Sequence, residues 1–221
     1  SGADLFISIH CNSAGRKPGG WYERRVAGYE TKESFITKKK KKIKVTKRVP
    51  VYENVFVPNK ASGTETYIWA AHENDHKESM VNTEDMGGEE DSTVTFDEND
   101  PVLQAYRLLY VKKFFKNSVM LAEMVEDEFV NAGRISRGVK QRNNEGIWVL
   151  HATGMPSILI EIGFISNKEE EEFINSEAGQ EQIVNNIISA LKNYIATLEK
   201  QKTQVQQNNG ETNEPKKGFT P

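Results

Sequence analysis

The segment that most constrains the fold is Ser157–Ile162, which reads Ser-Ile-Leu-Ile-Glu-Ile. A short run this rich in β-branched residues predicts a strand covered on both faces, as in the sheet of an α/β protein. Glu161 interrupts the run, and a carboxylate buried there costs several kcal/mol unless it is paired, protonated or beside a metal ion. An ion pair with Arg137 or Lys140 would give Glu161 a purely structural role, and a functional site is the alternative.

A second apolar run, residues 3–9, ends in three polar or reactive side chains, His10, Cys11 and Asn12. We expect this run to be a central strand of the same covered sheet, with the three side chains at its C-terminal end. A lone histidine is more often structural than metal-binding, but His10 and Glu161 support each other because active sites gather at strand ends. If one water joins a metal ion to a base, a ring nitrogen of His10 should lie within about 7 Å of the Glu161 carboxylate.

Charge and cysteine content exclude some classes of function. Cys11 is the only cysteine, so no internal disulfide can form. We favour a small buried residue at a strand end over a nucleophile for Cys11. The net charge of −3 gives no overall drive toward nucleic acid, and no apolar run approaches the roughly 20 residues of a membrane span. The chain enters an apolar strand almost at once, so we expect it to be truncated at its N-terminus, and its lack of a signal peptide is uninformative.

Strand and helix patterns alternate along the rest of the chain, which predicts an α/β architecture. Asp100-Pro101 is a typical helix start, and Gly133 is the expected stop, with a break expected near residues 116–118. Asn167 is expected to cap an acidic first turn. The other expected elements are strands at 63–69, 147–150 and 157–162, a last helix through Leu198, and a disordered tail or linker over 199–221.

Two segments between these elements have unusual compositions. Residues 16–60 read as an insertion, with period-two alternation that predicts an extended hairpin. Its lysine run, Lys38–Lys42, is a solvated strand edge, a patch for anionic surfaces or a localisation signal, and the solvated edge is favoured. Residues 72–100 are acidic and poor in large apolar side chains, which is typical of a lid or mobile loop.

Four blocks occur in an order that points to a family. They are Ala3–Asn12, Gly63–Tyr67, Arg137–Gln141 and Met155–Asn167. Their sequence resembles the catalytic domain of zinc-dependent N-acetylmuramoyl-L-alanine amidases of the cell-separation type. The resemblance covers residues 1–198 apart from the insertion at 16–60. It implies an α/β fold with a mixed central sheet covered by helices on both faces.

The resemblance also implies a mechanism, hydrolysis of the amide between N-acetylmuramic acid and L-alanine in peptidoglycan. In the family a His, a Glu and a second His hold zinc, and a Glu on a late strand is the catalytic base. His10 matches the second His and Glu161 matches the base, whereas Asn12 and Gln141 match positions that line the substrate cleft. The first His and the Glu ligand would lie before Ser1, so we expect this fragment alone not to hold zinc tightly and to be inactive. Structural capping by Asn12 is an equal alternative to substrate binding.

Some relatives carry a segment in which a Glu blocks the zinc until an activator protein relieves it, and residues 72–100 occupy that position. Glu84 is the candidate plug among several acidic residues there. The resemblance places the protein in the bacterial periplasm or cell envelope. The rival hypotheses are a non-catalytic module that binds cell wall or activator, and a docking role for the lysine-rich insertion on anionic lipid, wall polymer or nucleic acid.

Overall fold

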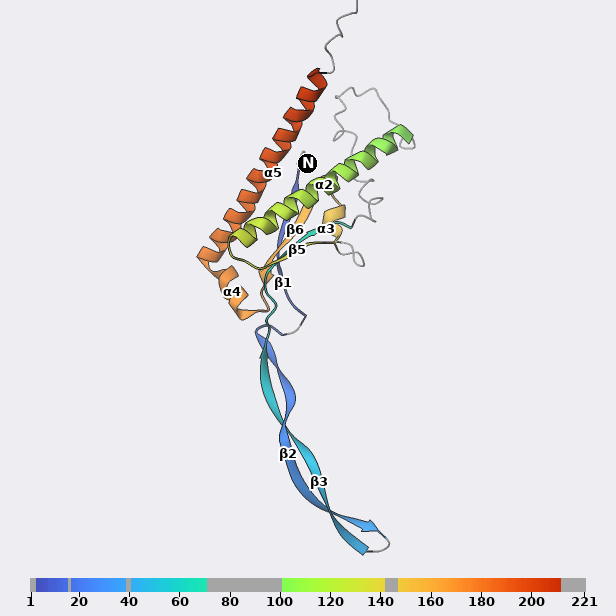
Figure 1. The fold of residues 1–221 in the computed structure, drawn as a ribbon, viewed down its shortest axis with the longest axis vertical. Coiled ribbons are helices and arrows are strands. Elements are labelled where there is room, and N and C mark those ends of the chain that lie inside the picture. Colours follow the sequence, from blue (N-terminus) through green and yellow to red (C-terminus); the bar gives the residue numbers. More distant parts are fainter. Residues whose placement is uncertain (1–2, 16, 39–40, 71–100, 142–146, 212–221) are drawn as a thin grey trace, which may run out of the picture.

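The computed structural model describes residues 3–15, 17–38, 41–70, 101–141 and 147–211. They form a four-stranded mixed sheet, in the order β1-β6-β4-β5, and a separate two-stranded hairpin (Figure 1). The strands are β1 (Phe6–Asn12), β2 (Gly20–Lys38), β3 (Lys41–Pro58), β4 (Thr64–Ile68), β5 (Ser136–Gln141) and β6 (Ser157–Phe164). The helices are α2 (Pro101–Asn131), α3 (Trp148–His151), α4 (Lys168–Asn175) and α5 (Glu177–Glu211). The predicted α/β fold with a mixed central sheet is therefore confirmed.

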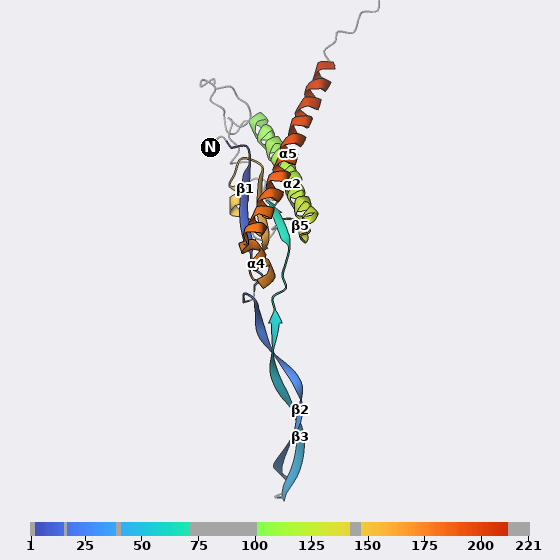
Figure 2. The ribbon, with the colours of Figure 1, turned by 90° about the vertical axis from the view of Figure 1, so that its left-hand side faces the viewer.

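The main core lies between the sheet and the two long helices. Alternate residues of β6, Ile158, Ile160 and Ile162, pack with the apolar stripes of α2 and α5. On α5 that stripe is Ile183, Ile187, Ala190 and Tyr194, at the three- and four-residue spacing of one helix face. Figure 1 shows the end of α2 close to the start of α5, with the two helices spreading apart from there, and Figure 2 shows them crossing. Because the β6 isoleucines occupy one face of the strand, Glu161 points to the other face.

The opposite face of the sheet is covered less completely by the described residues. Leu159 of β6 and Tyr67 of β4 pack there with Leu150 of the single-turn helix α3. β1 forms one edge of the sheet, and its Ile9 is 55% exposed. The expectation that β1 is a central, fully covered strand is therefore not met among the described residues, because β1 is an edge strand and Ile9 is largely exposed.

Several elements differ from the sequence-based expectations. α2 is one continuous helix, because the Ser118 hydroxyl donates to the Phe114 carbonyl at 2.9 Å instead of interrupting the backbone. The strand expected at 147–150 is the helix α3. α5 continues to Glu211, through part of the expected tail, since its glutamine- and lysine-rich end favours helix without needing a core. β5 was not expected, because an edge strand with Arg137 and Lys140 lacks apolar alternation.

A buried carboxylate on α2 fastens the helix to the sheet. Glu126 is 4% exposed and accepts hydrogen bonds from Thr64 at 2.9 Å and Thr66 at 2.7 Å. The Ser136 hydroxyl on β5 also donates to it. Three hydroxyl donors satisfy the carboxylate, so its burial is tolerated, and β4 and β5 are held at fixed positions beneath α2.

Across the described helices, none combines the length and the apolar character needed to cross a bilayer.

The hairpin β2-β3 confirms the extended structure expected within residues 21–60, and it projects away from the α/β body (Figure 2). It connects the end of β1 to the start of β4. Its base is tied to the loop after β6, since the Gly19 amide donates to the Ser166 carbonyl at 2.9 Å and the Asn167 side chain donates to the Ala61 carbonyl at 3.1 Å. The Asn59 amide also donates to the Gly19 carbonyl at 3.2 Å. These bonds fix where the ribbon leaves the body.

Candidate active site

Three polar residues, His10, Glu161 and Glu65, form a row across the middle of the sheet. β1 and β6 are parallel and pair His10 with Glu161, while β6 and β4 are antiparallel and pair Glu161 with Glu65. Side chains at paired positions of neighbouring strands point to the same face and lie about 5 Å apart at their β-carbons. This is the face of Leu159 and Tyr67, opposite to the face of Ile158, Ile160 and Ile162. The two residues singled out from the sequence, His10 and Glu161, are thus neighbours.

His10 and Asn12 stand at the open end of the row. The His10 imidazole is exposed, and its Nε2 lies 2.7 Å from the Ser8 hydroxyl on the same face of β1. The Asn12 amide donates to Glu65 over a long 3.5 Å, and its carbonyl accepts from the Ser13 amide at 2.7 Å. Asn12 therefore has the local capping contact expected of a structural residue and also reaches the row.

Glu65 is the most highly connected member of the row. It is 3% exposed and accepts from the Tyr67 hydroxyl at 2.6 Å, while Lys140 Nζ lies 2.7 Å away and Arg137 pairs with the same oxygen as Lys140. Burial raises the pKa of Glu65, but hydrogen bonds from Lys140, Tyr67 and Arg137, together with the Lys140 charge, outweigh burial and hold the pKa at about 2. Glu65 is therefore ionised at any physiological pH.

This arrangement changes the interpretation of Arg137 and Lys140. Both cations pair with Glu65, the neighbour of Glu161 on β4, and a structural role for Glu161 stays the alternative. The positive charges of Arg137 and Lys140 balance the negative charge of Glu65. The carboxylate beside Glu161 is therefore neutralised. Glu161 is half-buried, whereas the residues on either side of it in β6 are buried.

Cys11 does not behave as a nucleophile in this structure. The residue is exposed, so the expectation that it is a small buried residue is wrong, because β1 lies at the sheet edge. Partial burial of its thiol, and then the nearby Glu161 charge, raise its pKa above the ordinary value. A raised pKa keeps the thiol protonated, which is the opposite of what a thiolate nucleophile requires.

Gln141 is not brought into the row. It is paired with Ile68 at the far end of β5, and strand alternation places it on the face of Val139, away from Lys140 and Glu65. Lys140 lies on the row's face, and the role of Gln141 at the substrate cleft stays a prediction. Glu65 was missed as a site residue, although it carries the same signal as Glu161, a carboxylate within an otherwise strand-forming segment.

A metal site and an acidic regulatory segment were also expected from the sequence. Within the part of the chain that the structure describes, no three His, Cys, Asp or Glu side chains are placed to hold one ion. The described residues alone therefore do not fit a metal centre, although the exposed His10 imidazole could supply one ligand. Glu84 and the rest of residues 72–100 lie outside the described residues.

The end of β6 is held by a buried ion pair next to a glycine. Glu170 on α4 pairs with Arg134 at 3.2 Å and accepts from the Phe164 amide at 3.0 Å and the Gly63 amide at 3.2 Å. Gly163 has a φ of +151°, and a β-carbon there would lie 2.5 Å from the Glu170 carboxylate. Only glycine lets the strand come this close to the ion pair.

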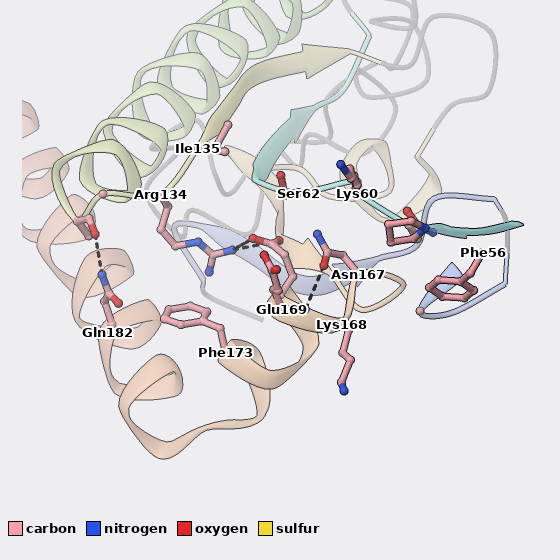
Figure 3. A pocket seen from close by; sticks show the side chains of 16 residues that line it. Phe56, Lys60, Ser62, Arg134, Ile135, Asn167, Lys168, Glu169, Phe173 and Gln182 are labelled. Carbon is pink, nitrogen blue, oxygen red and sulfur yellow. Dashed lines mark hydrogen bonds and ion pairs between the residues drawn. The ribbon is translucent and has the colours of Figure 1, made fainter. Parts of the chain in front are cut away.

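A cavity of about 1050 Å³ lies where the base of the hairpin meets α4 and the turn between α2 and β5 (Figure 3). Phe56 and Lys60 line one side, while Arg134 lies 4.6 Å over the Phe173 ring on the other. His10, Glu161 and Glu65 are not among its lining residues. The candidate site is therefore the polar row on the sheet face, separate from this cavity.

Comparisons with known proteins place the chain in a family. Residues 1–193 match the Amidase_3 family model, described as N-acetylmuramoyl-L-alanine amidase. The N-acetylmuramoyl-L-alanine amidase AmiC of Neisseria meningitidis is 37% identical over 83 residues, which are 37% of this chain and 19% of that protein. The probable cell wall amidase LytH of Staphylococcus epidermidis is 34% identical over 62 residues, which are 28% of this chain and 20% of that protein. The matched segments thus span about a fifth of these relatives' length.

Among solved structures, the CwlD amidase of Clostridioides difficile in complex with the GerS lipoprotein is similar at 18% identity and a TM-score of 0.45. The match covers 89% of this chain and 57% of that chain. The amidase AmiC2 of Nostoc punctiforme is similar at 16% identity and a TM-score of 0.44, covering 88% of this chain and 59% of that chain. The family model covers most of the chain, and the chain therefore belongs to the Amidase_3 family of N-acetylmuramoyl-L-alanine amidases.

Proposed function

We propose that this chain is the C-terminal part of an amidase domain that hydrolyses the amide between N-acetylmuramic acid and L-alanine in peptidoglycan. The observation that carries the proposal is the row formed by His10, Glu161 and Glu65 on one sheet face. It combines an exposed imidazole with a half-buried carboxylate and a second carboxylate that is already neutralised by cations. Membership of the family supplies the reaction class.

In the proposed reaction Glu161 is the general base. It accepts a proton from the water that attacks the carbonyl carbon, and it returns that proton to the L-alanine nitrogen as the C–N bond breaks. The products are a free lactyl carboxylate and a peptide with a new amino terminus. Glu161 needs to be ionised for the first step, and Glu65 beside it is already paired with Arg137 and Lys140.

The proposed cofactor is zinc, with His10 as one ligand. The exposed ring of His10 is at the open end of the row, where it is accessible to an ion. The remaining ligands would come from outside the described residues. Asn12, which reaches Glu65 and caps the turn after β1, is proposed to contact substrate at the same end of the row.

Glu65 is proposed as a positioning residue. Its carboxylate joins β4 to Arg137 and Lys140 on β5 and to Asn12 on β1, so it links both sides of β6. A buried, ionised group with this many partners holds the strands beside Glu161 in register. Its contribution to the reaction would come through geometry and charge balance, without direct contact with the scissile amide.

We also propose that the activity is controlled and takes place in the cell envelope or periplasm. The acidic segment 72–100, with Glu84 as the candidate plug, follows β4 directly in the sequence, and β4 carries Glu65. In this proposal the Glu84 carboxylate competes with substrate for a cation held by His10. An activator protein that withdraws the segment would then raise activity.

The experiment uses the full-length protein with zinc and purified sacculi, and it measures new L-alanine amino termini. Glu161→Gln should lower the rate by about 10² to 10⁴, because it removes general base catalysis and keeps the side chain's size. Tyr67→Phe is a matched control on the same face. It removes one hydrogen bond to Glu65 and keeps the base, so its rate should stay within about ten-fold of the wild type.

Two results would contradict the proposal in different ways. Undiminished release of L-alanine termini by Glu161→Gln would remove Glu161 from the base role. Binding of the wild-type protein to sacculi without any hydrolysis, in the presence of zinc and activator, would instead favour the non-catalytic wall-binding alternative.

A further inference from the structure

The hairpin β2-β3 is the largest feature that the proposed reaction does not use. Its strands have 19 and 18 residues and pair with each other in a sheet of their own. Figures 1 and 2 show the ribbon extending alone beyond the body, so both of its faces meet solvent. An isolated two-stranded ribbon is marginally stable in water, and large apolar side chains on it are costly unless something covers them.

The pairing register places five of the hairpin's six aromatic residues on one face, here called the aromatic face, and the sixth, Trp21, on the other. The aromatic face carries Tyr22, Tyr29, Phe35, Tyr52 and Phe56. A bulge between Val26 and Gly28 shifts the alternation by one residue, which lets odd-numbered Tyr29 and Phe35 join even-numbered Tyr22. The Tyr22 and Phe56 rings pack edge to face at 5.3 Å. All five rings are between 45% and 71% exposed.

Cations are interleaved with these rings. Arg24 lies 4.0 Å over the Tyr52 ring and Arg48 lies 5.1 Å over the Tyr29 ring, both on the aromatic face. Residues 20–58 contain eleven lysines and arginines against four glutamates, a net charge of +7, so the rest of the chain carries −10. The positive charge is therefore concentrated on the ribbon and is not a property of the whole protein.

A surface that alternates exposed rings with cations fits an anionic glycan. Aromatic rings pack on the apolar faces of sugars, and lysine and arginine pair with carboxylates or phosphates along the polymer. A bilayer fits less well as the partner. Insertion into a bilayer would need apolar residues at the tip of the hairpin, but the strand ends there carry Lys38, Lys41 and Lys42, and the aromatic residues are spread along its length. An extended polymer can lie along an extended ribbon and use all of these positions.

The two strands of the hairpin continue from and into the strands that carry the row. β2 follows β1, which carries His10, and β3 leads into β4, which carries Glu65. β1 and β4 lie on either side of β6, which carries Glu161. Because the hairpin base is hydrogen-bonded to the loop after β6, a polymer on the ribbon is held at a defined position relative to the row.

We propose that the aromatic face of the β2-β3 hairpin binds an anionic cell-wall glycan and holds it beside the row of His10, Glu161 and Glu65. This inference rests on the proposed function for the identity of the polymer. The rings supply contacts to sugar faces, and Arg24, Arg48 and Lys42, which share the aromatic face, supply contacts to the acidic groups.

The test measures sedimentation of the full-length protein with purified sacculi, alongside hydrolysis of a soluble muramoyl peptide. The variant Y22S/Y29S/F35S should bind sacculi about ten-fold more weakly or worse, and hydrolyse the soluble substrate at the wild-type rate. The matched control I36S/I43S/V51S removes exposed apolar residues from the other face and should bind normally. R24Q/R48Q keeps the rings and should weaken binding most at low salt, where charges are least screened.

Sacculi with and without their covalently attached phosphate polymers distinguish peptide carboxylates from phosphates as the acidic partner. Equal binding by the wild type and the triple serine variant would overturn the inference, as would tighter binding to single-stranded DNA or to anionic lipid vesicles than to sacculi. Failure of the wild type to hydrolyse the soluble substrate would count against the proposed function. The sedimentation result would still decide whether the hairpin binds the glycan.

Discussion

The contribution of Glu65 to stability can be worked out from its surroundings. A pKa of about 2 in the folded protein, against 4.5 for a free glutamate, corresponds to at most about 3 kcal/mol at neutral pH. The side chains of Arg137 and Lys140 are 42% and 34% exposed, so solvent screens their charges. We therefore expect Glu65→Gln to lower the free energy of unfolding by about 1–2 kcal/mol at pH 7.

The effect has a defined dependence on pH. Because the pKa of Glu65 is lower in the folded than in the unfolded state, its stabilisation is fully present above pH 4.5 and is lost as the pH falls toward 2. The difference between wild type and Glu65→Gln should therefore shrink between pH 7 and pH 3. Urea unfolding at several pH values, followed by circular dichroism, measures it, and the melting temperature at pH 7 should fall by about 3–6 °C.

A surface control makes the result specific. Glu181 is exposed on α5, and Glu181→Gln should change the free energy of unfolding by less than about 0.5 kcal/mol at either pH. If Glu65→Gln were as stable as the wild type at pH 7, or if its deficit stayed constant down to pH 3, the electrostatic account of Glu65 would be wrong.

Two other changes test separate parts of the structure. Gly163→Ala should lower the free energy of unfolding by about 1–3 kcal/mol, because the new β-carbon would lie 2.5 Å from the Glu170 carboxylate at a φ of +151°. An unchanged midpoint of urea unfolding would contradict this. Glu84→Ala in the full-length protein should raise basal hydrolysis of sacculi in the absence of activator if Glu84 is the plug, with Glu78→Ala as the control, and an unchanged basal rate would exclude that role.

Much of the body of the fold could be predicted because its signals are local. The apolar runs that became β1 and β6 and the Asn167 cap, whose side chain accepts from the Glu169 amide at 3.0 Å, depend on neighbouring residues only. β5 could not be recognised, because its lysine and arginine are explained by a partner on another strand, Glu65. α3 was assigned as a strand because four residues are too few to show a period.

The site was predictable in part for the same reason. A carboxylate in an apolar strand identifies Glu161 from the sequence, but the pairing of His10, Glu161 and Glu65 depends on strand order, which no local pattern encodes. The aromatic face was hidden for a different reason. The bulge between Val26 and Gly28 reverses the relation between odd and even positions, so simple alternation assigns Tyr22 and Tyr29 to opposite faces.

The length of the hairpin sets a distance scale for the protein. Eighteen residues of β3, at about 3.3 Å each, extend about 60 Å from root to tip, which is longer than the sheet that carries the row. A glycan bound along this length would stay tethered to the body while its free repeats meet the site. Each new encounter between an amide and Glu161 would then be intramolecular, governed by an effective concentration that the ribbon sets and dilution does not change.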